Sequence, residues 1–356
     1  MAEVLMVSKP VEAPWNDSSK NLVRDVAAHL PRHQPLVMGR GGLFGPPRAG
    51  TVPVYSERSR FAPSLASSAR VLLHLLLRSR APLWHFFFAP NPKTSAAGRA
   101  ASRLRRVRTL HTICSAPRRS QALRRILFAD CNVVLSAHTE ARLAAEGIAS
   151  RRIPPAIPLL DVPAKESRDS FRRKHDLSES PLVVYPGDLE FGGGASLVLR
   201  AAAELSDVQV VMACRRKTPE AEAAAATLQR FADANLPGRV QWWGETRKIH
   251  QLLGAADVVA LPSTDLYAKM DYPLVLLEAM AMERGVVVAQ GTPAAELAQG
   301  GAAIACAATE DDVGHAILAA FEDAELGTRA RARVIRDHDP RGMAAAYADL
   351  YDELLG

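Results

Sequence analysis

Short apolar runs alternate along the chain with longer stretches of helical periodicity. The Val-rich runs 257–261 and 285–289 are too short for helices and predict buried strands. Between them, Leu274, Leu277 and Met280 recur at helical spacing. A strand, a helix and a second buried strand in this order predict a parallel sheet covered by helices. The loop after the first strand then lies at the carboxyl end of the sheet, where open α/β sheets bind their ligands.

The same alternation extends over most of the chain. A first strand is predicted at 3–8, followed by a loop and by a helix that begins after Asp17, Ser18 and Ser19. Further strands, separated by helical segments, are predicted at 83–89, 107–111, 132–136, 182–186, 208–214, 239–243 and 302–305. The closely spaced glycines of 38–45 are followed by the turn sequence PPRAG instead of a helix, so they do not predict a phosphate-binding loop.

One stretch interrupts this pattern and divides the chain. Residues 161–180 are charged and have little apolar periodicity, which predicts a linker. We therefore expect a first Rossmann-like domain at 1–160, a second at 181–339, and a terminal helix at 340–356. The chain has 356 residues, of which 48% are hydrophobic, enough for two separate cores.

Charge is distributed unevenly between the two halves. Residues 1–160 contain 24 Lys and Arg against 8 Asp and Glu, whereas the remainder contains 20 against 30. A basic first half favours an anionic lipid surface or an acidic acceptor as partner, and solvated arginines without a partner are the competing interpretation. The basic run 99–108 offers only Leu104 and Val107 as an apolar face, a poor membrane helix by itself. It also lacks interleaved aromatic residues, so we expect no nucleic-acid binding.

Other classes of protein are disfavoured by what the sequence lacks. The cysteines at 114, 131, 214 and 306 are widely spaced and predict neither a disulfide framework nor a zinc site. The first ten residues do not have the pattern of a signal peptide, and the apolar run within 70–80 is too short to span a bilayer. We expect a cytoplasmic protein, with a peripheral position at the inner membrane face as a second interpretation.

The stretch 255–289 also contains a specific motif. Pro262 and Ser263 follow the predicted strand, the segment LLEAMA at 276–281 contains Glu278, and Gly285 opens the next Val run. These residues resemble the nucleotide-binding signature of family-4 retaining glycosyltransferases. The resemblance implies the GT-B fold, in which two Rossmann-like domains have parallel sheets facing a central cleft. It also implies an acceptor in the first domain, a nucleotide-sugar in the second, and a terminal helix that crosses back to the first domain.

The chain departs from the family pattern at three positions. Met270 stands where the family has the first of two glutamates, with Lys269 and Asp271 on either side. Asp188 and Gly193 stand where the family has an Arg and a Lys that hold the donor diphosphate. We hypothesise that Arg215, Lys217 and Lys269 replace the missing cations, the alternative being a solvated basic turn at 215–217.

The resemblance also implies roles for individual residues. The donor-binding set comprises Glu278 for the ribose diol, the backbone at Gly193, Gly194, Tyr272 and Leu274 for the diphosphate, and Gly244 and Glu245 beside the nucleoside base. Arg215 and Lys217 complete this set. The catalytic set comprises His111, which faces the donor sugar in the family, and Lys269 and Asp271, which take over contacts of the missing glutamate. A capping or surface histidine is the alternative for His111.

The function that follows is a metal-independent retaining glycosyltransferase of the hexosyl or a related class. It needs no cofactor and moves a sugar from a nucleotide-sugar to a glycan, lipid-linked or small-molecule acceptor. The three departures favour an alternative, an inactive GT-B subunit that serves as a binding scaffold in a glycan-assembly complex. A sugar-nucleotide epimerase is a third interpretation, but we find no additional acid/base carboxylates for it.

Overall fold

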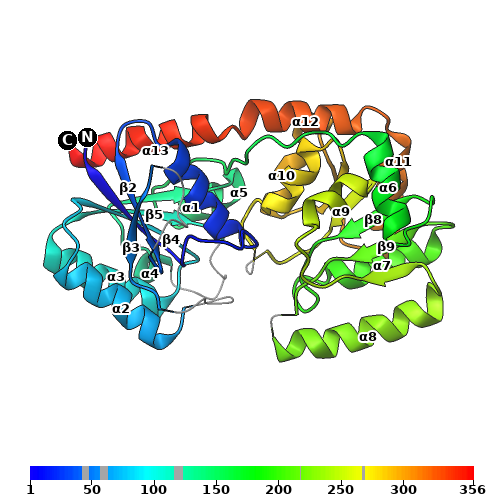
Figure 1. Cartoon of the computed structure of the whole chain (residues 1–356), viewed down its shortest axis with the longest axis horizontal. Helices are drawn as coiled ribbons and strands as arrows, with labels where there is room; N and C mark the ends of the chain where they lie inside the picture. Colours follow the sequence, from blue (N-terminus) through cyan, green and yellow to red (C-terminus); the bar gives the residue numbers. More distant parts are fainter. Residues whose placement is uncertain (42–47, 57–62, 116–122, 217, 267–268) are drawn as a thin grey trace. The chain divides into compact units, whose positions relative to one another are not determined.

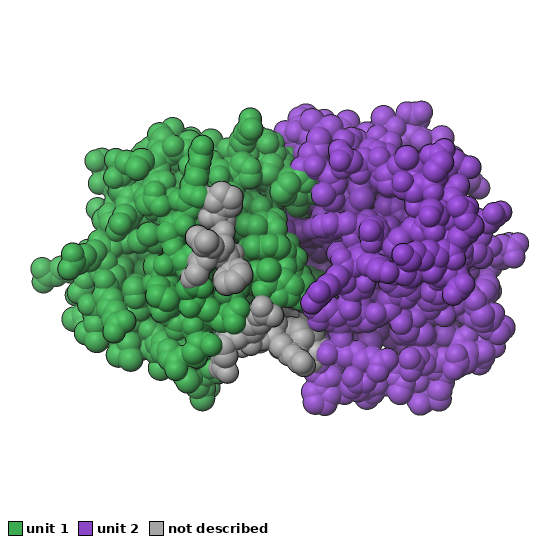
Figure 2. Space-filling model, in the orientation of Figure 1, with its two compact units in different colours: residues 1–158, 269–272, 338–356 green, residues 159–268, 273–337 purple. Residues whose placement is uncertain are grey.

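The computed structural model describes residues 1–41, 48–56, 63–115, 123–216, 218–266 and 269–356. The chain forms two compact units (Figures 1 and 2). Unit 1 comprises Met1–Pro158, Lys269–Tyr272 and His338–Gly356. Unit 2 comprises Leu159–Ala268 and Pro273–Asp337. Each unit has its own parallel sheet and its own helices, so each is described separately.

The sheet of unit 1 is entirely parallel in the described residues and has the order β3-β2-β1-β4-β5-β6-β7. Its strands are β1 (Glu3–Val7), β2 (Gln34–Gly39), β3 (Gly50–Pro53), β4 (Leu83–Phe88), β5 (Arg108–Ile113), β6 (Cys131–Val134) and β7 (Arg151–Arg152). The central strands β1 and β4 are buried and apolar, as expected of strands that helices cover on both faces.

The helices of unit 1 cover both faces of this sheet. They are α1 (Ser18–His29), α2 (Leu65–Leu77), α3 (Pro92–Arg105), α4 (Leu123–Ile126), α5 (Ala137–Ala145) and α13 (Pro340–Leu355). On one face, Trp84 and Phe86 of β4 form a core with Leu75 of α2 and Ala101 of α3. Alternate residues of a strand point to opposite faces, so His85 projects to the other face, where it meets Tyr351 of α13.

A buried polar network fixes α13 to the sheet. Nδ1 of His85 lies 2.7 Å from the Tyr351 hydroxyl, and Nε2 lies 2.7 Å from Oγ1 of Thr112. The same Oγ1 lies 2.9 Å from the Tyr347 hydroxyl. Every member of this network is buried, so its hydrogen bonds are needed to offset the loss of water. The terminal helix is thereby an integral part of unit 1.

The sheet of unit 2 is also parallel throughout the described residues, with the order β10-β9-β8-β11-β12-β13. Its strands are β8 (Leu182–Tyr185), β9 (Gln209–Met212), β10 (Val240–Trp242), β11 (Val258–Leu261), β12 (Gly285–Ala289) and β13 (Ile304–Cys306). Its helices are α6 (Lys165–Lys174), α7 (Gly194–Glu204), α8 (Pro219–Asn235), α9 (Ile249–Ala255), α10 (Leu274–Ala281), α11 (Glu310–Glu322), α12 (Leu326–Asp337) and the 3₁₀ segment η1 (Pro293–Gly301).

These two sheets confirm the prediction of two Rossmann-like α/β domains. Two strands at the edge of unit 1 are missing from the prediction. β2 ends at Gly39, inside the glycine-rich stretch 38–45 for which no strand was predicted, and β3 is only four residues long with glycine at its start and proline at its end. Such residues weaken the strand pattern, although an edge strand tolerates them.

The prediction of a linker at 161–180 is wrong for its central part. Helix α6 occupies this stretch, and none of its residues is buried, which explains why the sequence shows no apolar face. Polar contacts hold the helix instead. Arg172 Nη2 lies 2.7 Å from Asp257 Oδ2, and Arg168 Nη2 lies 3.0 Å from Asp257 Oδ1. Asp257 precedes β11, so α6 is anchored to the sheet of unit 2 by charge.

The segment 269–272 was assigned to the second domain because it lies between β11 and α10 in the sequence, but its contacts place it in unit 1. The amide of Asp271 donates to the carbonyl of Cys114 at 3.1 Å, and Oγ of Ser136 donates to Asp271 Oδ2 at 2.8 Å. Ser115 also donates to the carbonyl of Lys269. These bonds join the segment to the ends of β5 and β6.

The described residues contain neither a membrane-spanning helix nor a group of side chains suited to a metal ion. No helix among the described residues combines the length and apolarity needed to cross a membrane. Within the same residues, no group of three His, Cys, Asp or Glu side chains could hold a metal ion.

Candidate functional site

The strand order of unit 2 indicates where a ligand binds. Its six strands follow the doubly wound order in which the chain reverses direction between the first and fourth strands, here β8 and β11. At such a switch point the two following loops diverge and leave room for a ligand outside the carboxyl ends of the strands. The loop after β8 leads into α7, and the loop after β11 leads towards α10.

Hydrogen bonds tie these two loops together. The amide of Thr264, after β11, donates to the carbonyl of Gly192, after β8, at 3.0 Å. The hydroxyl of Tyr185 donates to the carbonyl of Asp188 at 2.8 Å and lies 3.3 Å from Oγ of Ser263. Burial raises the pKa of Tyr185 well above its usual value, so the hydroxyl keeps its proton and remains a donor. The loops therefore form one preorganised surface.

Glycine is required at two neighbouring positions of this surface. Gly193 has φ +68°, and a Cβ there would meet no atom within 4 Å, so the residue borders open space. Gly194 is the first residue of α7, and a Cβ on it would lie 2.4 Å from Oγ of Ser263. A side chain at Gly194 would push α7 away from the loop after β11. The glycines thus allow backbone amides to approach the space above the switch point.

Two helices begin at this edge of the sheet. Gly193 is the N-cap residue of α7 and Pro273 is the N-cap residue of α10. Neither helix start has a capping hydrogen bond from the side chain of its N-cap residue. The first amides of a helix carry a partial positive charge and are suited to bind an anion such as a phosphate. Leu274 opens α10, and its side chain is buried, so it can serve a ligand only through its backbone. The arrangement suits a diphosphate.

Glu278 lies one turn into α10. Its side chain is 15% exposed, and Oε1 lies 3.5 Å from Nε2 of His250, in α9. A carboxylate at this depth near the helix start can accept hydrogen bonds from the two hydroxyls of a ribose. His250 was not among the residues that the sequence analysis singled out. A single histidine in a polar helical segment gives no signal, and only the packing of α9 against α10 reveals its position.

Of the three cations expected to replace the missing Arg and Lys, the structure describes two, and they belong to different units. Arg215 follows β9, next to β8 in the sheet, and is partly exposed. Lys217 lies outside the described residues. Lys269 belongs to unit 1, where its carbonyl is bound by Ser115. In unit 2, Arg215 is therefore the described candidate for a cation near the switch point.

The turn at Gly244 and Glu245 follows β10, at the edge of the sheet and two strands away from β8. Trp243, before this turn, is packed against α6, with its ring centroid 5.0 Å from that of His175 and 5.9 Å from that of Phe171. Trp243 is thus partly buried against α6. Gly244 has φ +63°, and Glu245 is exposed.

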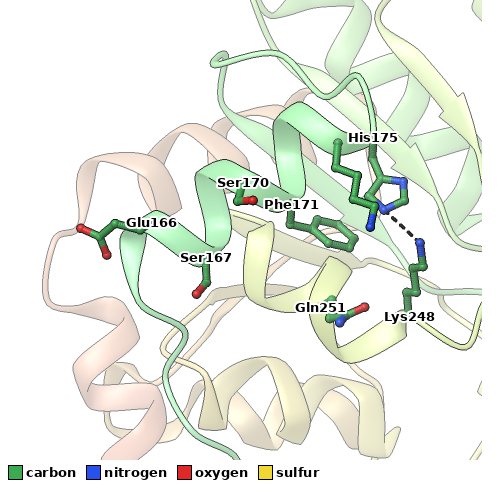
Figure 3. A pocket seen from close by; sticks show the side chains of 8 residues that line it. Glu166, Ser167, Ser170, Phe171, His175, Lys248 and Gln251 are labelled. Atoms are coloured by element: carbon green, nitrogen blue, oxygen red, sulfur yellow. Dashed lines mark hydrogen bonds between the residues drawn. The ribbon is translucent and has the colours of Figure 1, made fainter.

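A groove of about 430 Å³ lies beside this aromatic cluster, on the surface between α6 and α9 (Figure 3). It is lined by residues of α6, by Gln251 of α9, and by His175 and Lys248. Nζ of Lys248 lies 3.2 Å from Nε2 of His175. None of the predicted donor-binding residues lines this groove, so it is not the site proposed at the switch point.

The expectation that His111 ends its strand is wrong. Strand β5 continues to Ile113 because it pairs with β4 up to Phe88. His111 is fully buried, its ring lies 4.3 Å from that of Phe88, and Nε2 lies 3.1 Å from the Phe88 carbonyl. Nδ1 of His111 finds no hydrogen-bond partner among the described residues. Burial lowers the pKa of His111 from 6.5 to about 4, so the ring is neutral at physiological pH.

Asp271 and Tyr272 are buried in unit 1 as well. Asp271 is bound by Ser136, the residue that caps α5, and therefore lies at the start of that helix. A carboxylate there is stabilised by the helix dipole. The ring of Tyr272 lies 5.7 Å from that of His338. Both residues thus make these contacts within unit 1.

The chain resembles known glycosyltransferases in part of its sequence and in its fold. Residues 180–323, which include both switch-point loops and Glu278, match the family model described as Glycosyl transferases group 1. No curated protein matches the sequence.

Solved structures resemble the whole chain. Anabaena HepE in complex with UDP-glucose has a TM-score of 0.80 at 16% identity, covering 99% of this chain and 100% of that one. Sucrose-phosphate synthase from Thermosynechococcus elongatus has a TM-score of 0.80 at 17% identity, covering 100% and 99%. A glycosyltransferase from Rickettsia africae has a TM-score of 0.75 at 14% identity, covering 99% and 98%. At these identities the likeness establishes the fold, which is GT-B.

Proposed function

We propose that this protein is a glycosyltransferase that takes a sugar from a nucleotide-sugar bound at the switch point of unit 2. The family match supports this proposal because it spans the residues of that site, from the loop after β8 to the helix that contains Glu278. The similar fold of Anabaena HepE, whose structure contains UDP-glucose, supports a sugar linked to a nucleoside diphosphate as the donor class.

The observation that carries the proposal is the pair of helix starts, α7 and α10, at the β8–β11 switch point. Each helix start is equivalent to roughly half a positive charge. Together they supply about as much charge as one of the two cations that the family pattern would provide. Arg215 adds one formal charge, so two helix starts and this arginine supply about as much positive charge as the lost pair, before the negative charge of the buried Asp188 is counted.

In this proposal the chemistry is electrostatic. The glycosidic bond to the diphosphate breaks, and the amides at Gly194 and Leu274 stabilise the negative charge that develops on the leaving oxygen. Glu278 fixes the ribose, so that the sugar is held in one position while the acceptor hydroxyl attacks from the same face and gives its proton to the leaving diphosphate oxygen. Transfer then proceeds with retention of configuration and without a metal ion or cofactor. Unit 1 supplies the acceptor site.

His111 and Asp271 have no part in this mechanism. Both side chains are buried in unit 1, and each is held by a hydrogen bond from or to its neighbours. Buried groups that are held in this way are poorly placed to transfer a proton to a substrate. We assign both residues to the stability of unit 1.

The proposal is tested by thermal unfolding and by hydrolysis in a panel of UDP-, GDP-, ADP- and TDP-sugars. A donor present at one hundred times its dissociation constant stabilises the protein by about 2.7 kcal/mol, which shifts the melting temperature by a few degrees. We expect one nucleotide class to do so and to be hydrolysed slowly. A panel in which no sugar nucleotide raises the melting temperature would contradict the proposal.

One observation favours a second function, that of a donor-binding scaffold without catalysis. Asp188 is buried in the loop where the family pattern has a cation, and Gly193 supplies no charge. A scaffold of this kind would be stabilised by a sugar nucleotide in the same panel but would neither hydrolyse it nor transfer its sugar. The two functions are therefore separated by the hydrolysis measurement.

A further inference from the structure

Helices α2 and α3 of unit 1 expose large apolar side chains. Leu65, Leu73 and Leu77 of α2 are 91%, 54% and 73% exposed, and Leu104 of α3 is 74% exposed. The three leucines of α2 are spaced by eight and four residues, so they lie on one face of the helix. Burying a leucine contributes roughly 1.5–3 kcal/mol, so four exposed leucines on two helices leave substantial free energy available for binding.

The two helices present these side chains on the same outer layer. α2 and α3 pack against each other and cover one face of the sheet of unit 1 (Figure 1). Leu75 and Ala101 point inward and join the core around Trp84 and Phe86. Because the inward faces are occupied by the core, the opposite faces of both helices form the surface of this layer. We call this surface, defined by the outward residues of α2 and α3, the α2–α3 surface.

The charge around this surface has a single sign. The 72 residues from 58 to 129 contain 15 Lys and Arg and no Asp or Glu. Exposed cations on and beside the two helices include Arg70, Arg78, Arg80, Lys93, Arg103 and Arg106. Within the described part of the chain, none of these six forms an ion pair with a carboxylate. The surface is therefore both apolar and strongly cationic.

We propose that the α2–α3 surface docks on an anionic lipid bilayer. The leucines insert at the level of the headgroups, and the surrounding arginines contact the lipid phosphates. A second copy of this chain is a poor occupant because the same cations would face one another. A nucleic acid would pair with the arginines but would leave the leucines without an apolar partner. A bilayer of negative lipids satisfies both components of the surface.

The basic run 99–108 by itself was too poor in apolar residues to support this interpretation. The structure changes the assessment because α2, more than 25 residues earlier in the sequence, lies beside α3 and adds its three exposed leucines. A helix of 13 residues is about 20 Å long, too short to span a hydrocarbon core of about 30 Å. It therefore lies in the plane of the membrane surface. The inference concerns a partner of unit 1 and does not depend on the proposed sugar transfer.

The test is co-sedimentation of the full chain with vesicles of phosphatidylcholine, with and without phosphatidylglycerol. Two double variants address the two components: L73S with L77S, and R78Q with R103Q. Matched controls are L318S and R173Q, at exposed positions of α11 and α6 in unit 2. Circular dichroism and thermal unfolding establish that all variants are folded.

We expect binding to anionic vesicles only, weakened by salt. Each neutralised arginine should lower the partition coefficient about fivefold, so that R78Q with R103Q loses about 25-fold. The leucine variant should lose at least about tenfold, and both controls should bind as the unaltered protein does. The proposal is overturned if the chain binds neutral and anionic vesicles equally, or if the folded double variants bind anionic vesicles as well as the controls do. It is also overturned if the chain binds duplex DNA or an acidic protein but no vesicle.

Discussion

Oε1 of Glu278 lies 3.5 Å from Nε2 of His250, which connects α10 to α9 beside the switch point of unit 2. The carboxylate is mostly buried, whereas the histidine is mostly exposed, so the imidazole covers one side of the carboxylate. A neutral imidazole that donates to the carboxylate would hold it in one orientation and leave the second oxygen for a ligand. We infer that His250 positions Glu278 for the ribose of the donor.

Replacing Glu278 should weaken donor binding. The change E278Q keeps the shape of the side chain but removes the charged acceptor, and a hydrogen bond to a charged group contributes about 1.5–3 kcal/mol. We expect the dissociation constant of the sugar nucleotide to rise about 10- to 100-fold. Isothermal titration measures it, with E322Q on α11 as the control. If E278Q binds as tightly as the control, Glu278 does not contact the donor.

Gly193 and Gly238 form a natural matched pair. They have φ +68° and +73°, and a Cβ on either would meet no atom within 4 Å. Replacement by alanine should lower the free energy of unfolding by a similar amount, about 1–2 kcal/mol, at each position. Only G193A places a methyl group at the start of α7, where we expect the diphosphate. G193A should therefore lose affinity for nucleoside diphosphates and G238A should not, whereas equal affinities would remove Gly193 from the site.

Replacing Asp271 tests whether its carboxylate stabilises the fold or takes part in catalysis. Its Oδ2 accepts from Ser136 at 2.8 Å inside unit 1. The change D271N should lower the free energy of unfolding by about 1–3 kcal/mol, because a buried hydrogen bond to a charged acceptor is weakened. At a temperature where the variant is fully folded, the rate of sugar transfer should be nearly unchanged. A fall of more than about 100-fold in the turnover of folded D271N would identify a catalytic role instead.

His111 should make the stability of the protein depend on pH. Burial lowers its pKa from 6.5 to about 4, so the unfolded chain binds a proton that the folded chain does not bind. The resulting stability is complete above pH 6.5 and is lost as the pH falls towards 4, by about 1.4 kcal/mol per pH unit. Urea unfolding at a series of pH values should show a shallower slope for H111Q than for H315Q, an exposed control. Parallel slopes would contradict this assignment.

The order of strands and helices was predictable from the sequence because its signals are local. The strands of unit 2 are Val-rich runs between amphipathic helices, and β12 was predicted at its observed bounds. Strand β3 and helix α6 were not predicted because their own residues do not show the pattern of a strand or of an amphipathic helix. β3 combines a glycine and a proline in four residues, and α6 has no buried residue that could mark a helical face.

The site was only partly predictable because its key relationships are tertiary. The motif around Glu278 predicted the helix that is α10, but His250, the neighbour of Glu278, belongs to another helix. Asp271 was assigned to donor chemistry from its place in the motif. Its partner Ser136 is 135 residues away, and no periodicity in the sequence connects the two. His111 was expected at the end of a strand at 107–111, as in the family that the chain resembles, whereas the pairing of β5 with β4 continues to Ile113.

The central claim is that a donor diphosphate rests on the helix starts at the switch point of unit 2. Crystals soaked with the sugar nucleotide that gives the largest thermal shift test it most directly. We predict diphosphate density within hydrogen-bond distance of the amides of Gly194 and Leu274, with the ribose hydroxyls on the carboxylate of Glu278. Density for the nucleotide elsewhere, such as in the groove between α6 and α9, with the switch-point loops unchanged and empty, would contradict the account.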